Sequence, residues 1–333
     1  MISMKLKTAC VSLIAISAFS MAACSPESGG TPEGTEGLKN TASLAEDEKI
    51  AGGEEGVSSD SGAYPVDPSL ANNEVVAEAF QGSGEILKSL EVESAAETSR
   101  LLALQPITAD GTNVESIILP DDRVKVTNTA SFPQRAQVLI ALPGGRCSGV
   151  MVGKDLVLTA GHCVHSGGSA GAWMKSATVY PGRNGTTSPF GSCTAKRFYS
   201  VKGWTESRNS NYDFGAIKLN CDIGNRVGWL GFFFRPGSLV NLAATISSYP
   251  GDKPLEQWAH TGAVKQSNDL KTYYDTDTMP GNSGSGVFAA SGVPVGCNGP
   301  CVHTAHAYGG SLNSGTRLSR ALFDNLLKWK NEQ

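Results

Sequence analysis

Three short segments of this chain carry the side chains that activate a serine hydroxyl. His162 lies in TAGHC, Asp213 in NYDFG and Ser283 in GNSGS, in the order His, Asp, Ser and 51 and then 70 residues apart. A serine hydroxyl is a weak nucleophile at neutral pH, so an imidazole must take its proton and a carboxylate must orient that imidazole. The three segments together predict acyl transfer.

Each segment alone has an ordinary structural interpretation. Gly-rich serine stretches are usually loops, AGHC could form a buried turn, and YDFG could form a strand edge. In this order, and each beside a β-type apolar run, they favour a catalytic site. The glycines around Ser283 permit a tight turn that aims its Oγ outward, and the N–H groups of Gly281 and Ser283 then converge on the developing oxyanion.

Short apolar runs separated by turn residues must position these segments. After Ile117, runs such as QVLIAL at 137–142 and SGVMV at 148–152 alternate with Gly, Pro, Asn and Ser. This spacing is typical of an all-β protein. Only the C-terminal tail is expected to be helical, with Ser319 as its N-cap.

Charge divides the 333-residue chain into unlike parts. Residues 25–115 hold 18 acidic and 4 basic residues, whereas residues 116–333 hold 13 acidic and 21 basic ones. A basic domain can bind nucleic acid, but no aromatic and basic interleaving or nucleic-acid motif supports that function here. We therefore expect the basic part to steer acidic polypeptides.

The first 24 residues have the form of an export signal. Two lysines precede an apolar stretch over residues 9–23, which is too short to span a bilayer comfortably. We expect residues 1–24 to be a signal peptide and the protein to be secreted. The MAAC sequence ending at Cys24 also resembles a lipobox, so lipidation of Cys24, which would tether only the precursor, and ordinary cleavage stay equal alternatives.

Residues 25–115 have the composition of a removable acidic propeptide. Residues 25–68 are rich in Gly, Ser, Glu and Pro with almost no aromatics, which predicts a disordered tether. Apolar residues between Val75 and Leu104 suggest amphipathic helical turns. This second stretch is either a small chaperoning prodomain or a loosely helical acidic linker.

Six of the eight cysteines lie in residues 116–333, an even number for an oxidising compartment. Cys297 and Cys301 would close a small loop, and Cys147 lies one strand before Cys163. Elimination then pairs Cys193 with Cys221. Zinc is a weaker interpretation, because no second close Cys or His pair shows ligand spacing. The expected disulfides are Cys147–Cys163, Cys193–Cys221 and Cys297–Cys301.

Longer motifs resemble the glutamyl endopeptidases, a family of secreted bacterial serine proteases. These motifs are YPGDK at 249–253, DTMPGNSGS at 277–285, GPC at 299–301 and GTR at 315–317. The resemblance runs from about Ser116 to about Lys330. It implies a chymotrypsin-like double β-barrel that cleaves polypeptides after Glu and less well after Asp, with His162, Asp213 and Ser283 as base, orienting acid and nucleophile.

The resemblance also implies a pocket for an acidic side chain. The family uses a threonine five residues before the nucleophile and a histidine on a late strand, which correspond to Thr278 and His306. The hydroxyl and a protonated imidazole can both hydrogen-bond a carboxylate. His303 is the alternative, but it lies three residues earlier and should point to the opposite strand face. The ordinary interpretation of either histidine is a surface side chain whose hydrogen bonds are already satisfied.

Two residues near the serine bear on specificity and activation. Asp277 stands where trypsin-like enzymes carry the acid that attracts Lys or Arg, although some glutamyl endopeptidases also have Asp there. Asn282 cannot form the ion pair by which a new N-terminal amine switches on chymotrypsin-like zymogens. In the resembling family that amine instead lies near the acid pocket, and here it would belong to Ser116 or Ile117.

Glutamate usage supports the same specificity without any resemblance. Residues 25–115 contain 14 Glu in 91 positions, whereas residues 116–333 contain three in 218. An enzyme that cuts after Glu would digest itself at exposed Glu, and Asp is not comparably scarce in the second part. The bond between Glu115 and Ser116 is therefore the expected processing site.

The sequence as a whole predicts a secreted preproenzyme with a signal peptide (1–24), an acidic propeptide (25–115) and a serine protease domain (116–333). We expect a monomer without metal or organic cofactor, which binds acidic polypeptides and its own propeptide. Two alternatives stay open. One is a trypsin-like or broad protease of the same fold, and the other is a non-catalytic surface lipoprotein on a protease scaffold.

Overall fold

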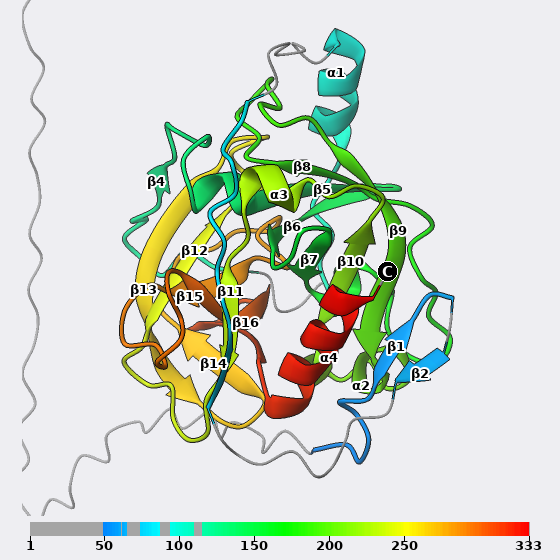
Figure 1. Cartoon of the computed structure of the whole chain (residues 1–333), viewed down its shortest axis with the longest axis vertical. Coiled ribbons are helices and arrows are strands. Elements are labelled where there is room, and N and C mark those ends of the chain that lie inside the picture. Colours follow the sequence, from blue (N-terminus) through cyan, green and yellow to red (C-terminus); the bar gives the residue numbers. More distant parts are fainter. Residues whose placement is uncertain (1–48, 61, 65–73, 87–93, 110–114, 333) are drawn as a thin grey trace, which may run out of the picture. The chain divides into compact units, whose positions relative to one another are not determined.

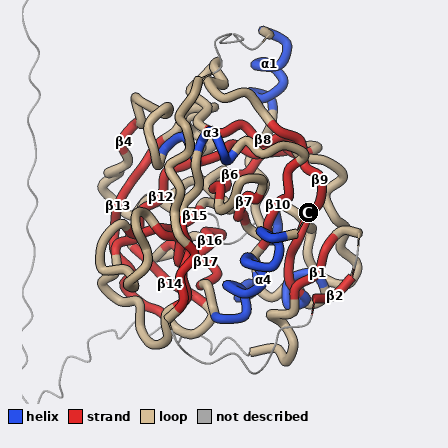
Figure 2. The backbone as a smooth tube through the Cα atoms, viewed as in Figure 1, coloured by secondary structure: helices blue, strands red, loops and turns tan. Residues whose placement is uncertain are grey.

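Strands and loops make up most of the structure, a computed structural model that describes residues 49–332 except 61, 65–73, 87–93 and 110–114. The expected signal peptide and residues 25–48 lie outside the described residues. The longest helices described are α1 (Ala95–Ala103) and α4 (Arg320–Asn331), as Figure 2 shows. No described helix has the length and apolar character needed to cross a membrane.

Six antiparallel strands form the first barrel. Their order is β10-β7-β6-β5-β8-β9, and a further pairing between β10 and β9 closes the sheet. The apolar run at 137–142 becomes a strand that is buried along its whole length, as its lack of polar residues at alternate positions predicts. The strands are β5 (Gln137–Leu142), β6 (Gly145–Met151), β7 (Leu156–Thr159), β8 (Thr178–Pro181), β9 (Cys193–Val201) and β10 (Gly215–Leu219).

Six further strands form the second barrel, in the order β15-β12-β13-β14-β17-β16 with β15 pairing β16. Outside it, β11 (Gly231–Phe234) runs parallel to β16, and β4 (Val124–Lys125) pairs β13. Figure 1 shows both sheets, and the expected all-β double barrel is confirmed. The strands are β12 (Ala243–Ser248), β13 (Trp258–Ser267), β14 (Lys271–Tyr274), β15 (Gly286–Ala289), β16 (Cys301–Tyr308) and β17 (Asn313–Arg317).

The expected C-terminal helix is present as α4 (Figure 1, red). The Ser319 hydroxyl caps it by accepting a hydrogen bond from the Leu322 N–H, 3.2 Å away. Its apolar face packs on both parts of the fold, because Trp329 stacks on Tyr199 of β9 and Phe323 contacts Phe232 of β11. The remaining short helices are η1 (Gln134–Ala136), η2 (Gly161–Cys163), α2 (Lys202–Thr205), η3 (Ser210–Tyr212) and α3 (Gly224–Val227).

Three disulfides join the pairs that the sequence favoured, which are Cys147–Cys163, Cys193–Cys221 and Cys297–Cys301. The first links β6 to η2. The second ties the start of β9 to the loop after β10, and the third closes the turn before β16. Each therefore fixes a loop against a barrel strand.

The described part of the segment before Ser116 differs from expectation. Instead of a tether, it forms β1 (Gly56–Ser58), which pairs β9, and β2 (Gly62–Tyr64), which pairs β1. Val75–Ala77 is a strand, β3, that pairs β11, so helix begins only at α1. The physical reason is that part of one side of β9 and one side of β11 are left open by the strands after Ser116, and the unpaired backbone groups there can pair with an extended segment.

Candidate active site

The loops at the ends of two paired strands bring His162 and Asp213 together. His162 lies in η2 directly after β7, Asp213 directly precedes β10, and these strands pair antiparallel. Oδ2 of Asp213 lies 2.8 Å from Nδ1 of His162, and Oδ1 accepts the His162 backbone N–H at 2.8 Å. Both carboxylate oxygens are thus used to orient one buried imidazole.

Ser283 comes from the second barrel, in the turn between β14 and β15. The turn needs glycine on both sides of the serine, because φ is 106° at Gly281 and 86° at Gly284. A Cβ added at Gly284 would lie 2.0 Å from the Thr159 hydroxyl. Ser148 of the first barrel secures the turn by donating its N–H to the Ser283 carbonyl at 2.9 Å and its hydroxyl to the Gly281 carbonyl at 2.8 Å.

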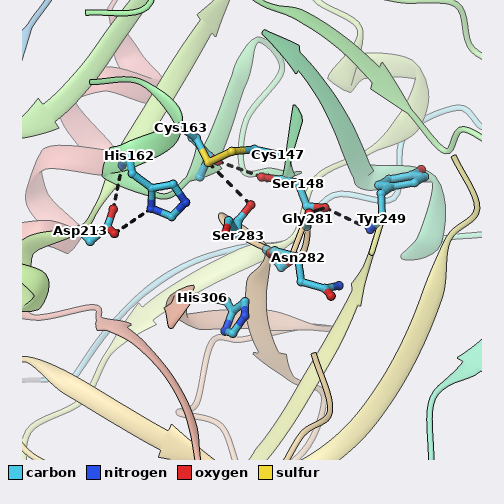
Figure 3. Close-up of a disulfide and its surroundings, with 12 residues drawn as sticks. Cys147, Ser148, His162, Cys163, Asp213, Tyr249, Gly281, Asn282, Ser283 and His306 are labelled. Atoms are coloured by element: carbon cyan, nitrogen blue, oxygen red, sulfur yellow. Dashed lines mark hydrogen bonds and ion pairs between the residues drawn. A yellow bond between two sulfur atoms is a disulfide. The ribbon is translucent and has the colours of Figure 1, made fainter. Parts of the chain in front are cut away.

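Figure 3 shows the imidazole of His162 turned toward Ser283, with Asp213 on its other side. Within the described part of the chain, the N–H groups of Gly281 and Ser283 donate to no other group. The Asn282 side chain accepts the Met279 N–H at 2.8 Å and donates to the Ser248 hydroxyl, so it braces the turn.

The hydroxyl of Ser283 donates its hydrogen bond to the carboxyl group of Glu115. His162 Nε2 consequently has no hydrogen-bond partner among the described residues. Burial raises the pKa of Glu115 to about 7, against the opposing hydrogen bond from Ser283. For His162, burial lowers the pKa, but the charge and hydrogen bond of Asp213 and the charge of Glu115 outweigh it, so the net shift is upward.

His306 lies close to the same carboxyl group. Its Nε2 is 3.9 Å from Oε1 of Glu115, and its Nδ1 is 2.6 Å from the hydroxyl of buried Tyr274. Complete burial, and next the charge of His162, lower the pKa of His306 to about 3. The Thr278 hydroxyl and His306 Nε2 are both buried without a hydrogen-bond partner among the described residues. Both are polar atoms able to bond a further group, and His306 Nε2 is the one that lies near the Glu115 carboxyl group.

His303 points elsewhere, as its place on the strand predicts. Its Nε2 is 3.2 Å from the Ala243 carbonyl and its Nδ1 is 3.0 Å from the Thr304 hydroxyl. Burial lowers the pKa of His303 to about 4. Only His306 of these two histidines is therefore near Ser283.

Asp277 faces the segment that follows Ser116. Its Oδ1 accepts the Ile118 N–H at 2.7 Å and its Oδ2 accepts the Asp122 N–H at 2.8 Å. Its own N–H donates to Nδ1 of His260 at 2.8 Å. The acid that suggested trypsin-like specificity thus already has two backbone partners.

Two side-chain groups in the described residues have a composition that could hold a metal ion. Cys147, His162 and Cys163 form one, but its two sulfurs are joined in a disulfide. Asp122, His260 and Asp277 form the other, and there the backbone hydrogen bonds just described already occupy the ring nitrogen and both Asp277 oxygens.

Sequence reasoning missed Asn313 and Tyr274. Asn313 lies opposite Tyr274 where β17 pairs β14, and its buried amide binds both backbone groups of Ser116. Each is a single polar residue on a strand, without a motif around it. The one available signal was that these two residues are polar and lie on late strands. This does not identify the groups that they contact.

The segment before Glu115 runs along the same site. Residues 105–107 lie beside β6, where the Arg146 N–H donates to the Gln105 carbonyl and the Ile107 N–H donates to the Arg146 carbonyl, both at 2.9 Å. Further on, Arg208 donates to the Ala109 carbonyl at 2.7 Å. The described chain thus contacts the catalytic region on both sides of residues 110–114.

Known proteins are similar to this chain in sequence and in fold. A trypsin-like peptidase domain matches residues 147–296. A glutamyl endopeptidase of Bacillus licheniformis is 43% identical over 80% of this chain and 83% of its own length. A Bacillus subtilis protein named extracellular metalloprotease is 36% identical over 76% of this chain and 79% of its own. A solved structure of Glu endopeptidase in complex with MPD is 30% identical with a TM-score of 0.60, over 65% of this chain and all of that one. The chain is therefore a serine peptidase that belongs to the glutamyl endopeptidase family.

Proposed function

We propose that this protein is a secreted endopeptidase that hydrolyses polypeptides after Glu, less well after Asp, and is made as a preproenzyme. One observation carries the proposal. The carboxyl group of Glu115 lies between the Ser283 hydroxyl and Nε2 of His306, inside the catalytic region. A site that accepts one glutamate carboxyl group without exposing it to water is suited to accept that of a substrate.

His162, Asp213 and Ser283 carry out the reaction in this proposal. Once the Glu115 carboxyl group leaves, the Ser283 hydroxyl can bond to His162 Nε2, which takes its proton as the oxygen attacks the peptide carbonyl. Asp213 holds the imidazole by Nδ1 and stabilises its positive charge. The N–H groups of Gly281 and Ser283 receive the oxyanion, and water then hydrolyses the acyl-enzyme.

Thr278 and His306 select the acid. Both present a buried polar atom with no partner among the described residues, so a bound carboxylate would satisfy two groups whose isolation is unfavourable. A substrate without a carboxylate would leave them unsatisfied. Buried donors of this kind give strong discrimination between otherwise similar side chains.

The trypsin-like alternative is less well supported. It requires Asp277 to bind a Lys or Arg side chain, but both oxygens of Asp277 accept backbone N–H groups and its side chain is fully buried. A substrate cation there would have to displace those hydrogen bonds.

Maturation in this proposal removes residues 1–24 as a signal peptide and then residues 25–115 as a propeptide. The Glu115–Ser116 bond is the self-processing site, the mature domain spans 116–333, and the freed amine belongs to Ser116. We propose a monomer that needs no cofactor and whose partners are acidic polypeptides and its own propeptide. Any membrane tether would come from lipidated Cys24 and would hold only the precursor.

Mapping the bonds cut in an unrelated polypeptide by mass spectrometry tests the specificity. We expect cuts after Glu, and cuts after Lys or Arg would refute the acid pocket. Thr278→Val and His306→Ala should each raise KM for a Glu peptide by about tenfold or more while an active-site serine probe still labels Ser283. Unchanged Glu cleavage in both variants would favour the trypsin-like or broad alternative.

A further inference from the structure

One asparagine holds both backbone groups of Ser116, the residue after the proposed cleavage site. Oδ1 of Asn313 accepts the Ser116 N–H at 2.9 Å. Nδ2 donates to the Ser116 carbonyl at 2.6 Å and to the Thr276 carbonyl at 2.8 Å. Asn313 is fully buried. Because both N–H donors of the amide meet carbonyl groups, the orientation of the side chain is fixed by the network.

Further contacts fix the neighbouring chain. The Thr278 N–H donates to the Ser116 carbonyl at 3.0 Å, which places Ser116 directly beside the pocket threonine. The carboxylate of Asp277 holds the N–H groups of Ile118 and Asp122. The start of the mature domain is therefore already in place while the chain is uncut.

Cleavage of the bond between Glu115 and Ser116 replaces an acid beside the pocket by a cation. Water adds across the Glu115–Ser116 peptide bond, the C–N bond breaks, Glu115 gains a main-chain carboxylate, and Ser116 gains an amine that takes a proton near neutral pH. The propeptide can then carry the Glu115 side chain out of the site. In the uncut chain burial lowers the pKa of His306, so its imidazole carries no charge there at neutral pH. The ammonium group of Ser116 becomes the cation next to the pocket.

We propose that Asn313 is a positioning residue for acid selectivity, which holds Ser116 beside Thr278 in the uncut chain so that hydrolysis places an ammonium group there without rearrangement of the barrels. The inference rests on the Glu specificity proposed above. It adds the residue that keeps the positive charge in reach of the substrate carboxylate.

This arrangement predicts a particular pH dependence. The titratable groups around the Ser116 amine are Glu115 beside it in sequence, His306 on β16, His162 across the site, and Asp277 with His260 behind it. With Glu115 gone, the amine, with an ordinary pKa of about 8, is the group expected to titrate in the alkaline range. The ratio of the rates with Glu and Gln substrates should fall in this pH range. Because the titration of His162 affects both rates, the ratio removes its contribution.

The test compares processed wild-type enzyme with Asn313→Leu, using matched Glu and Gln peptides from pH 6 to 10. We expect Asn313→Leu to raise KM for the Glu peptide by about tenfold with little change in kcat, and to flatten the alkaline decline of the Glu/Gln ratio. Gln257→Leu is the matched control, because Gln257 is a fully buried amide that donates to the Gln134 carbonyl at 2.9 Å, and both residues belong to the processed enzyme.

Carbamylation of the N-terminal amine with cyanate gives a second readout that does not depend on folding of the variant. It should lower the Glu/Gln ratio of the wild type by a similar factor and leave Asn313→Leu unchanged. A wild-type Glu preference that survives carbamylation, or an unaltered ratio in folded Asn313→Leu, would overturn the inference alone. A wild type with no Glu preference would overturn the proposed function as well.

Discussion

The segment before Ser116 and the domain after it contribute to the same sheets in different ways. The domain closes two barrels with its own strands, whereas the earlier segment adds β1 and β3 to the open sides of β9 and β11. The segment is rich in Glu and the domain has almost none. The segment thus pairs with backbone groups that the domain leaves open and adds side-chain contacts such as the ion pair of Glu55 with Lys202, and its Glu115 lies in the domain's catalytic region.

This difference fits the proposal that one chain holds both an enzyme and a segment that is removed from it. Pairing with an open strand edge requires no particular side chains. The paired part of the segment can therefore be rich in Glu, which a Glu-specific enzyme would cleave. Among the described residues of the segment, Glu115 hydrogen-bonds the Ser283 hydroxyl through its side chain.

Glu115→Gln should have the largest effect on the contact between the segment and the domain. The amide keeps the shape of the side chain but replaces one carboxyl oxygen by an NH₂ group, which cannot accept a hydrogen bond from Thr278 or His306 in the proposed pocket, so we expect processing after residue 115 to slow by about 100-fold. N-terminal sequencing of the purified protein over time measures it. Glu85→Gln, an exposed position in the same segment, is the control, and equal processing rates in the two variants would contradict the assignment.

Replacing both Cys193 and Cys221 by Ser tests whether the domain is independent of the segment. The disulfide closes a 28-residue interval, and its loss should lower the free energy of unfolding by about 3–4 kcal/mol. Because β1 pairs at Tyr199–Val201, away from Cys193, urea unfolding should show the same loss in mature protein and in a Ser283→Ala precursor. A loss confined to one form would show that the segment shares this part of the fold.

The docking of Glu115 should weaken as pH rises. Its pKa in the folded chain is about 7, above the ordinary 4.5, so docking is most stable below about pH 4.5 and loses stability up to about pH 7. In a Ser283→Ala precursor, protection of the Ser116 N–H from hydrogen exchange should fall by about tenfold between pH 5 and 8 after correction for intrinsic rates. A Glu115→Gln precursor should lack this fall, and an equal fall in both would assign it to another group.

The sequence predicted the parts of this molecule whose chemistry depends on residue type. A serine between glycines, a histidine before a disulfide cysteine and an acid before a strand identify the triad segments, and Ser319 identifies the start of α4. The short strands β1 and β3 could not be predicted, because pairing with an open edge, not their own pattern, makes them extended.

The roles of Asp277 and Asn313 were equally hidden in the sequence. Asp277 stands where an acid can set specificity, and only the fold shows that the Ile118 and Asp122 N–H groups occupy it. Asn313 lies 197 residues from Ser116, and no local pattern reports such a distant hydrogen bond.

A crystal structure of mature Ser283→Ala protein with a bound peptide containing one Glu tests the central claim most directly. The account predicts the Glu carboxylate within hydrogen-bond distance of the Thr278 hydroxyl and His306 Nε2, with the following peptide bond next to residue 283. A carboxylate in solvent, or a lysine side chain bound at Asp277 in its place, would contradict it.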